Sequence, residues 1–313
     1  MAYTTDAGSD PDKYTVGWIS AISIEAAQND NNVYILAEMA GHNVVIAVLP
    51  EGEYLTGAAA SVATTVLRTF KNVRIRLIVG VGGEAPSKDS NIRLGDVVVS
   101  SPRAGMGGSF EYDYGKTIQG QAFEHTCFFS LPPSLPRSAV SHLKTQYEDS
   151  GHHIDASIKS VIRGKPRLKK KHGWPENSSL WPSVSTLVCA ESCDAATEHV
   201  IHRRQRDGDE DDPAIHYWAI ASANQLIKYA LLRDQFSKEH GFLRFGMEAA
   251  ALMIDFLCLV VRGICDYSDT HKNKQWRGHA SITAAAYTKD LLRRVSPSRV
   301  NAEETLAMAV SAR

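Results

Sequence analysis

The segment from Glu248 to Asp269 constrains the fold of this chain more than any other. Good helix formers, with Ala-Ala-Ala-Leu-Met-Ile at the centre, fill Glu248 to Phe256 and predict a short helix. The run from Leu257 to Ile264 is almost continuously apolar and contains two adjacent valines, which is typical of a strand buried in a parallel sheet. Asp266 follows this run, where open α/β sheets place their ligands. We therefore expect a helix, a central strand and a functional carboxylate at the end of that strand.

Other apolar runs of strand character recur along the chain, with turn or helix signals between them. Strands are expected at Tyr14–Ile24, Asn32–Ala37, His42–Leu49, Arg76–Gly83, Leu94–Ser101 and Ile215–Ser222. Helices are expected at Gly57–Phe70, Ser138–Glu148 and Thr283–Arg294. This alternation predicts an α/β fold, a single domain with a mixed central β-sheet flanked by helices.

The chain has 313 residues, 43% of them hydrophobic, and can therefore bury a substantial core. We expect a flexible N-terminus over 1–13, one domain over 14–295 and a C-terminal tail over 296–313. Pro-rich and basic sequence predicts a surface insertion at about 131–213. Within it, Arg203–Pro213 is too charged to pack and is expected to form an exposed loop.

Composition narrows the class of partner. Lys and Arg together number 34 against 35 Asp and Glu, so no charge excess indicates nucleic acid or a membrane surface, and a small polar metabolite is the simplest partner. The first residues lack a secretory signal, and no apolar run approaches the roughly 20 residues that span a bilayer. We therefore expect a cytoplasmic protein. Its five cysteines, an odd number, are expected to be reduced thiols.

Two motifs raise the question of a cofactor. Cys189, Cys193, His199 and His202 have spacings that only loosely match a zinc site, so a metal is not favoured. The Gly80-Val-Gly-Gly83 sequence superficially matches a dinucleotide-binding fingerprint, but a polar stretch and another strand follow it where the fingerprint needs a helix. We therefore expect no metal and no organic cofactor.

Several motifs in a fixed order carry a family resemblance. They are Val16-Gly-Trp-Ile-Ser-Ala-Ile-Ser-Ile-Glu25, Gly80-Val-Gly-Gly83, Arg93-Leu-Gly-Asp-Val-Val-Val99, Tyr112-Asp-Tyr-Gly115, Met247-Glu-Ala-Ala250 and Arg262-Gly-Ile-Cys-Asp266. Together they resemble the nucleoside phosphorylase and nucleosidase superfamily, most of all its fungal branch, whose members occur alone or as the front module of immune-receptor-like proteins. The resemblance covers most of Tyr14 to Arg294 and is weak at 131–213. It implies a three-layer fold and cleavage of purine nucleosides.

The resemblance also implies roles for four residues. Glu248 would accept hydrogen bonds from the ribose hydroxyls, and Met247 would pack on the sugar. Asp266 would be the acid that donates a proton towards the purine N7, and Glu25 would position and deprotonate the attacking water. Carboxylates suit this reaction because breaking an N-glycosidic bond passes through an oxocarbenium-like sugar, so one acid must neutralise the departing base.

The base pocket and the sugar site involve further residues. The stretch that supplies an aromatic ring to the base in related nucleosidases corresponds here to Ser222–Ile227, where Asn224 replaces an Asp and Leu226 the ring. The remaining expected substrate contacts are Gly80, Gly82, Gly83, Ile227 and Cys265. We expect the glycines to form a turn after the Arg76–Gly83 strand that brings backbone N–H groups close to the ribose or the water.

Three functions stay open. The phosphorylases that this chain resembles hold phosphate with an Arg ahead of the glycine turn and a Ser or Thr within it, and here Leu77 and Gly80 occupy those positions. Arg76 is adjacent, but a one-residue step along an unbulged strand reverses the face of the side chain. We therefore favour a purine nucleoside N-ribohydrolase over a phosphorylase. The third function is a nucleoside sensor without turnover, because the segment after Glu25 lacks the long helix that braces this Glu in the family.

The resemblance finally bears on assembly. Family members are dimers or larger rings in which the neighbouring subunit often completes the pocket. We therefore expect a homo-oligomer, with the Tyr112-Asp-Tyr-Gly115 region as a candidate interface.

Overall fold

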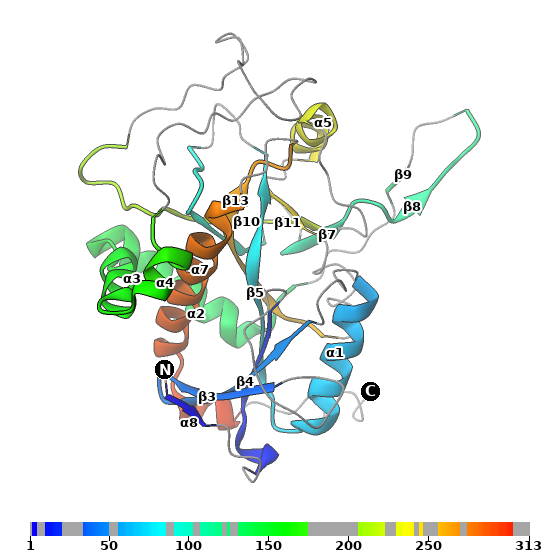
Figure 1. Cartoon of the computed structure of the whole chain (residues 1–313). Coiled ribbons are helices and arrows are strands. Elements are labelled where there is room, and N and C mark those ends of the chain that lie inside the picture. Colours follow the sequence, from blue (N-terminus) through cyan, green and yellow to red (C-terminus); the bar gives the residue numbers. More distant parts are fainter. Residues whose placement is uncertain are drawn as a thin grey trace.

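The computed structural model describes residues 2–4, 10–20, 34–49, 56–85, 91–102, 107–120, 124–125, 131–174, 206–222, 230–240, 244–246, 256–269 and 274–302. Its centre is strand β5 (Ile75–Glu84), which runs through the middle of a mixed sheet of eleven strands (Figure 1). No helix within these ranges is both long enough and apolar enough to cross a membrane.

On one side, β5 pairs with parallel strand β2 (Val16–Ser20). Next come β4 (His42–Val48), parallel to β2, and β3 (Tyr34–Met39), antiparallel to β4. The β3–β4 hairpin turns at Ala40 and Gly41, both with positive φ. Strand β1 (Ala2–Thr4) adds to the outer edge of β3.

On its other side, β5 pairs with parallel strand β13 (Leu259–Asp266), which confirms the buried strand predicted there. Strand β13 in turn pairs with antiparallel β6 (Val97–Ser100), and β6 with parallel β10 (Ile215–Trp218). Near its carboxyl end, on the edge opposite β13, β5 also pairs with β12 (Arg244–Gly246). The remaining strands are β11 (Ile220–Ser222) and β7 (Ser109–Glu111) beyond β12, and the separate ribbon of β8 (Gly115–Lys116) and β9 (Glu124–His125).

Helices cover both faces of the sheet. Helix α7 (Gln275–Arg293) packs on β5 and β13 from one face, whereas α1 (Thr56–Thr69) packs near β2 on the other (Figure 1). Alternate residues of each strand therefore enter different cores: Leu77 packs in the core on the α7 face, and its neighbour Ile78 in the core on the α1 face. These three layers confirm the predicted α/β fold class.

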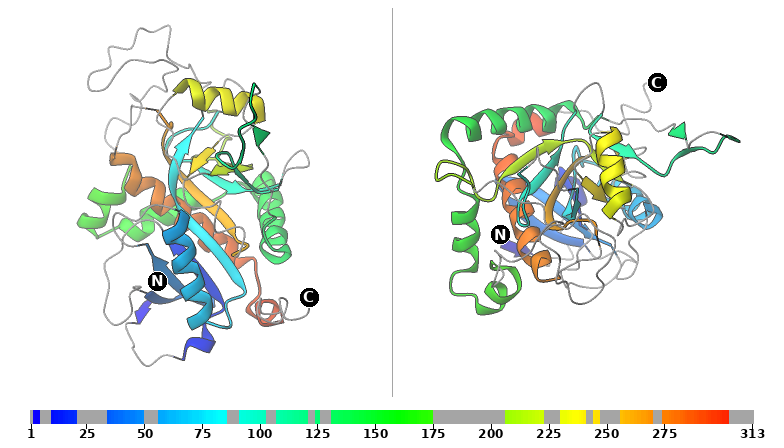
Figure 2. Two further views of the ribbon diagram at one scale, coloured as in Figure 1. Left: turned by 90° about the vertical axis from the view of Figure 1, so that its right-hand side faces the viewer. Right: turned by 90° about the horizontal axis from the view of Figure 1, so that it is seen from above.

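The region predicted as an insertion at 131–213 contributes three helices. They are α2 (Ser134–Ser150), α3 (Ile154–Ile162) and α4 (Pro166–His172). All three contact α7, as Figure 2 shows from above. Leu143 and Ile158 are buried in the same core cluster as Leu291 of α7. This region therefore adds a second layer of helix over α7, because its apolar side chains extend the main core.

The remaining described helices lie at the periphery of these layers. They are η1 (Pro11–Lys13), α5 (Ala230–His240) and α8 (Pro297–Ala302). Val300 of α8 is fully buried in the core on the α7 face.

Close packing of α7 on the sheet depends on Gly263 of β13. A methyl group at this position would overlap the backbone carbonyl of Ala280 in α7, and backbone atoms cannot move away as a side chain can. The missing Cβ thus sets how closely α7 approaches the strand that ends at Asp266.

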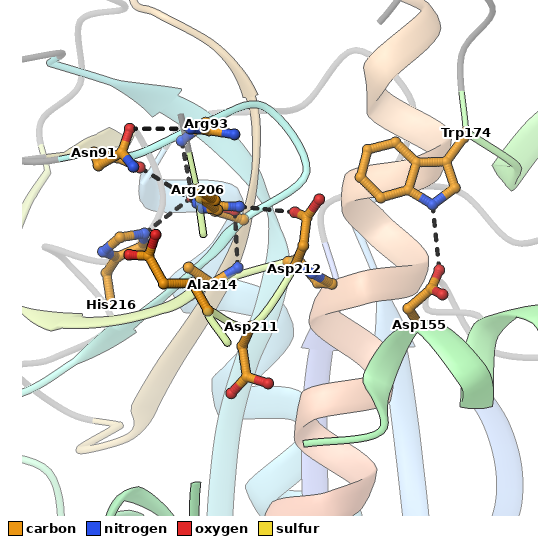
Figure 3. A network of polar contacts seen from close by, with 12 residues as sticks. Asn91, Arg93, Asp155, Trp174, Arg206, Asp211, Asp212, Ala214 and His216 are labelled. Atoms are coloured by element: carbon orange, nitrogen blue, oxygen red, sulfur yellow. Dashed lines mark hydrogen bonds and ion pairs between the residues drawn. The ribbon is translucent and has the colours of Figure 1, made fainter. Parts of the chain in front are cut away.

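The loop before β10 is anchored at Asp96, a fully buried carboxylate between β5 and β6. Arg206 forms an ion pair with Asp96 Oδ2, and His216 Nε2 lies 3.0 Å from the same oxygen. Figure 3 labels Arg206 and His216 among the residues of this polar network. The backbone N–H groups of Arg93 and Ala214 donate to the carboxylate at 2.8 and 3.0 Å. The prediction that the whole Arg203–Pro213 stretch is an exposed loop is therefore wrong at Arg206, because a buried counter-charge compensates its desolvation.

Two further predictions need correction. The expected turn at Gly80–Gly83 is absent, because β5 continues to Glu84 and pairs with β13 throughout this stretch. The expected strand Ile215–Ser222 is divided into β10 and β11, which pair with different partners. The predicted helix at Glu248–Phe256 lies outside the described residues, apart from Phe256 itself.

The Asp96 anchor predicts a pH-dependent contribution to stability. Burial alone would raise the pKa of Asp96, but the hydrogen bond and charge of His216 and then of Arg206 hold it below its ordinary value. A carboxyl group with a lowered folded-state pKa stabilises the fold above its unfolded pKa of about 4, and this stabilisation is lost as the pH falls through the folded value. We expect Asp96→Asn to lower the free energy of unfolding at pH 7 by about 3 kcal/mol.

The loss caused by Asp96→Asn should begin to shrink below about pH 4, where the unfolded wild-type chain takes up the proton, and should disappear only below the lowered folded-state pKa of Asp96. Urea unfolding across this pH range measures both quantities. Asp149→Asn, at an exposed carboxylate in α2, is the matched control and should stay within about 0.5 kcal/mol of wild type. A loss that is equally large at low and neutral pH would contradict the assignment of the effect to the Asp96 charge.

Candidate active site

The carboxyl end of β13 carries a β-bulge that places the predicted acid. Residues pair regularly from Leu259 opposite Leu77 to Ile264 opposite Gly82, and then Asp266 lies opposite Gly83. Cys265 is the extra residue of this bulge. Bulges re-aim side chains and are common next to active sites. Here the bulge brings Asp266 alongside the glycines of β5.

Asp266 is nearly buried, with 7% of its surface exposed. Its Oδ1 accepts a hydrogen bond from the backbone N–H of Ser268 at 2.9 Å, and the Cys265 thiol donates to its Oδ2 at 3.5 Å. A methyl group on Gly83 would overlap both Asp266 Oδ1 and Ser268 Oγ. The carboxyl group is therefore fixed by donors on one side and depends on the missing Cβ of Gly83 on the other.

The turn after β13 is held in an uncommon backbone conformation. Ser268 has a φ of +53°, which is costly for a residue other than glycine and persists only where neighbouring contacts impose it. Arg233 of α5 supplies one such contact, donating from Nη1 to the carbonyl oxygen of Tyr267 at 2.6 Å. The same Nη1 lies 3.7 Å from Oδ2 of Asp269. A buried ion pair therefore connects α5 to the turn that holds Asp266.

Gly80 and Gly82, the other predicted glycines, lie on β5 in the paired stretch before Gly83. Gly80 is buried, and a methyl group there would come 2.6 Å from Nη1 of Arg262, which lies opposite it on β13. Arg262 Nη1 donates to the carbonyl of Val81 at 3.4 Å. Gly80 therefore makes room for a buried guanidinium group that contacts the strand backbone.

The structure also shows whether an arginine side chain is placed where related phosphorylases hold phosphate, the alternative nucleophile to water. Leu77, which stands where related phosphorylases have an Arg, is completely buried in the core on the α7 face. Arg76 is 4% exposed on the opposite face, with its Cζ 5.6 Å from the ring centroid of Phe256. The register of β5 with β2 is regular from Arg76 opposite Gly17 to Ile78 opposite Ile19, so no bulge reverses this alternation. Burial lowers the pKa of Arg76 and raises that of the nearby Cys258 thiol to about 12.

Six of the predicted site residues lie outside the described residues, and their roles stay predictions. They are Glu25, Asn224, Leu226, Ile227, Met247 and Glu248. The described strands that precede them end at Ser20 in β2, Ser222 in β11 and Gly246 in β12. Phe245 of β12 lies opposite Gly83, the glycine that also lies opposite Asp266. The backbone leading to Glu248 therefore reaches the same point of β5 as the predicted acid.

Two other predicted positions are described. Cys265 is buried beside Trp276 and Ala280 of α7, and besides this apolar contact its thiol reaches Asp266. In the candidate interface, Tyr112 is buried and its ring lies 5.5 Å from that of Phe236, whereas Tyr114 is 56% exposed.

Arg233 and Ser268 are not among the residues predicted from the sequence. Arg233 has no signal, because a Leu-Arg-Asp stretch in an amphipathic helix is typical of a solvated face. Ser268 lies in a polar segment after a strand, where its φ could not be foreseen. Within the described ranges no group of three or more His, Cys, Asp or Glu side chains is arranged to hold a metal ion. The four predicted metal-site candidates near residue 195 lie outside those ranges.

Comparisons with known proteins show which proteins this chain resembles in sequence and in fold. No protein-family model matches the chain. It is 36% identical over 317 residues to a nucleotide-binding leucine-rich repeat (NLR)-like protein of Hyaloscypha variabilis. That match covers 96% of this chain but 31% of the relative, so the chain spans less than a third of the relative's length.

Solved structures share the fold over most of the chain. The 5′-methylthioadenosine/S-adenosylhomocysteine nucleosidase of Neisseria meningitidis, in complex with methylthio-immucillin-A, has a TM-score of 0.56 at 13% identity, with 90% of this chain and 99% of that chain covered. Futalosine hydrolase of Helicobacter pylori gives 0.53 at 13% identity, with the same coverage. A putative methylthioadenosine/S-adenosylhomocysteine nucleosidase of Borrelia burgdorferi, bound to adenine, gives 0.56 at 15% identity, with 90% and 100% covered.

At these identities the likeness concerns the fold, and it agrees with the order of motifs in the sequence. The Hyaloscypha relative agrees with the fungal branch that those motifs indicated. The chain therefore has the fold of the nucleoside phosphorylase and nucleosidase superfamily.

Proposed function

We propose that this chain is a purine nucleoside N-ribohydrolase, which cleaves the N-glycosidic bond with water and releases the free base and ribose. The observation that carries this proposal is the placement of Asp266 over Gly83 at the carboxyl end of two parallel strands, on a fold shared with nucleosidases. Open α/β sheets bind their ligands at this edge.

The reaction assigns a step to each carboxylate. As the bond between C1′ and N9 breaks, its electron pair moves to the purine, and protonated Asp266 gives its proton to N7. Water adds to C1′ of the oxocarbenium-like sugar and loses a proton to Glu25. Glu248 holds the ribose hydroxyls, and the other predicted contacts line the pocket. No metal or organic cofactor takes part.

The environment of β5 favours water over phosphate as the nucleophile. A phosphorylase needs a cation within hydrogen-bonding reach of the phosphate, and Arg usually supplies it through paired N–H groups. At the matching position this chain has Leu77, which is buried in the core, and Arg76 points to the other face against Phe256. Phosphate-dependent cleavage is therefore the less favoured reaction.

One observation supports a second function. The relative from Hyaloscypha is NLR-like and more than three times as long as the matching region. A nucleoside-binding module in a protein of that kind could act as a sensor in a fungal defence system, binding the ligand without turnover. Binding of a nucleoside with no release of base after long incubation would favour this function over hydrolysis.

The assembly and location are part of the same proposal. We expect a cytoplasmic homo-oligomer, with exposed Tyr114 in the contact region. A small-molecule nucleoside is the proposed partner, rather than nucleic acid or a membrane.

The direct test is incubation of the protein with adenosine, inosine, guanosine, 5′-methylthioadenosine and uridine, with and without added phosphate. We expect a purine nucleoside to release free base at the same rate in both conditions, with ribose or its 5′-substituted form as the second product. Chromatography separates base, sugar and sugar phosphate. Base release that requires phosphate would replace the hydrolase by the phosphorylase.

Asp266→Asn tests the proposed general acid. We expect kcat to fall by roughly 10²–10⁴-fold, because general acid catalysis contributes this much, while binding of a purine nucleoside persists. Asp149→Asn removes an exposed carboxylate of α2 and should leave kcat unchanged. Full activity in the folded Asp266→Asn protein would exclude Asp266 as the acid.

Gly83→Ala tests the packing that fixes the acid. The added methyl group would overlap Asp266 Oδ1, so the carboxyl group must move, and a displacement of about 1 Å can cost roughly 10²-fold in rate. We therefore expect a fall in kcat of about this size from steady-state base release. Gly208→Ala is the control, because a methyl group there meets no atom within 4 Å. Unchanged kcat in Gly83→Ala would show that the acid does not depend on this contact.

A further inference from the structure

We infer that Arg233 is a positioning residue for catalysis, which holds the turn Asp266–Asp269 in the conformation that places Asp266 over Gly83. This inference rests on the proposed function, because it assigns Arg233 a role in the same reaction. Arg233 lies on α5, about 30 residues before the acid in sequence, and has no part in the motifs that carry the family resemblance.

The contacts of Arg233 converge on this turn. Its side chain is completely buried, and its Nη1 donates to the carbonyl oxygen of Tyr267, the residue after the acid, at 2.6 Å. The same nitrogen lies 3.7 Å from Oδ2 of buried Asp269. The guanidinium group therefore contacts the turn on both sides of Ser268, whose N–H holds Oδ1 of Asp266.

The turn needs such a restraint. Ser268 has positive φ, and such a conformation persists only where surrounding contacts impose it. Without Arg233, the Tyr267 carbonyl would lose a donor, and the Asp269 carboxylate would be left in a buried position without this cation. Both losses favour a rearranged turn, and the Ser268 N–H that orients the acid would move with it.

The position of α5 argues for a role at the site. The helix lies beside the end of β13, at the edge of the sheet (Figure 1). None of the described buried core clusters includes a residue of α5. Leu232, next to Arg233, is 37% exposed. A fully buried arginine on a helix of this kind serves the turn that it contacts more than it serves the hydrophobic core.

A neighbouring carboxylate supplies a matched control. Asp234 Oδ1 accepts from Nε of Arg233 at 2.7 Å, but its side chain is 35% exposed and belongs to the same helix. Asp269, by contrast, is buried and belongs to the turn. The inference predicts that Asp269→Asn impairs catalysis and Asp234→Asn does not, although each removes one carboxylate partner of the same guanidinium group.

The kinetic test compares Arg233→Met, Arg233→Lys, Asp269→Asn and Asp234→Asn with wild type in steady-state base release from the best nucleoside of the panel. We expect Arg233→Met to lower kcat by roughly 10²-fold with KM within about threefold, because the acid is displaced while the ribose contacts remain. Arg233→Lys should recover part of this loss, because it keeps the charge without the planar donor geometry. Asp234→Asn should behave as wild type.

A second measurement reports on the turn without catalysis. Cys265 precedes the acid and is 3% exposed. Cys258 lies immediately before β13, at the opposite end of that strand, and is fully buried. Alkylation with iodoacetamide, followed by peptide mass spectrometry, measures the labelling rate of each thiol. In Arg233→Met we expect the rate at Cys265 to rise about tenfold and the rate at Cys258 to stay unchanged, because opening is confined to the turn.

The outcomes separate this inference from the proposed function. Wild-type protein that releases no base contradicts the proposed function, and the labelling of Cys265 then still tests whether Arg233 holds the turn. Wild-type kcat and wild-type labelling in folded Arg233→Met overturn the inference. If Arg233→Met unfolds, the labelling rate of Cys258 will rise as much as that of Cys265. Arg233→Lys and Asp269→Asn then decide the question, and wild-type kcat in both variants overturns the inference.

Discussion

The pairing of β13 with β5 is the interaction on which the rest of this structure depends. Six residue pairs in regular register join the two parallel strands, and the bulge at Cys265 then sets Asp266 against Gly83 as the seventh pair. The register that buries Leu77 opposite Leu259 also decides which side chains reach the strand ends. A one-residue slip would reverse every face, so the core and the site are fixed by the same hydrogen bonds.

Around this pairing, glycines, which have no side chain, are as important as the charged residues. Gly263 admits helix α7, Gly80 admits the Arg262 guanidinium, and Gly83 admits the Asp266 carboxyl group. In each case the glycine provides space, and none of the three has the positive φ that usually explains a conserved turn glycine. The glycine-rich stretch of β5 is thus a close-packing surface for the elements that carry the chemistry.

Much of the fold could be predicted because apolar periodicity is local. The run at Leu257–Ile264 identified β13, and the Ala-rich stretch at Gly57–Phe70 identified α1. Predictions failed where partners are distant in sequence. Arg206 was assigned to an exposed loop, yet it pairs with Asp96, 110 residues away, and nothing near Arg206 in the sequence signals that carboxylate.

The sequence by itself determined the α/β class, the central strand and the position of a carboxylate at its end, because hydrophobic pattern and residue order are enough for these. Tertiary structure alone decided that Asp266 packs against Gly83 and that Arg233 donates a hydrogen bond to the following turn. The first contact joins residues 183 positions apart and the second joins residues 34 positions apart. Both depend on strand register, a bulge and the packing of α5. Such contacts arise only when distant segments pack together, so no local pattern can encode them.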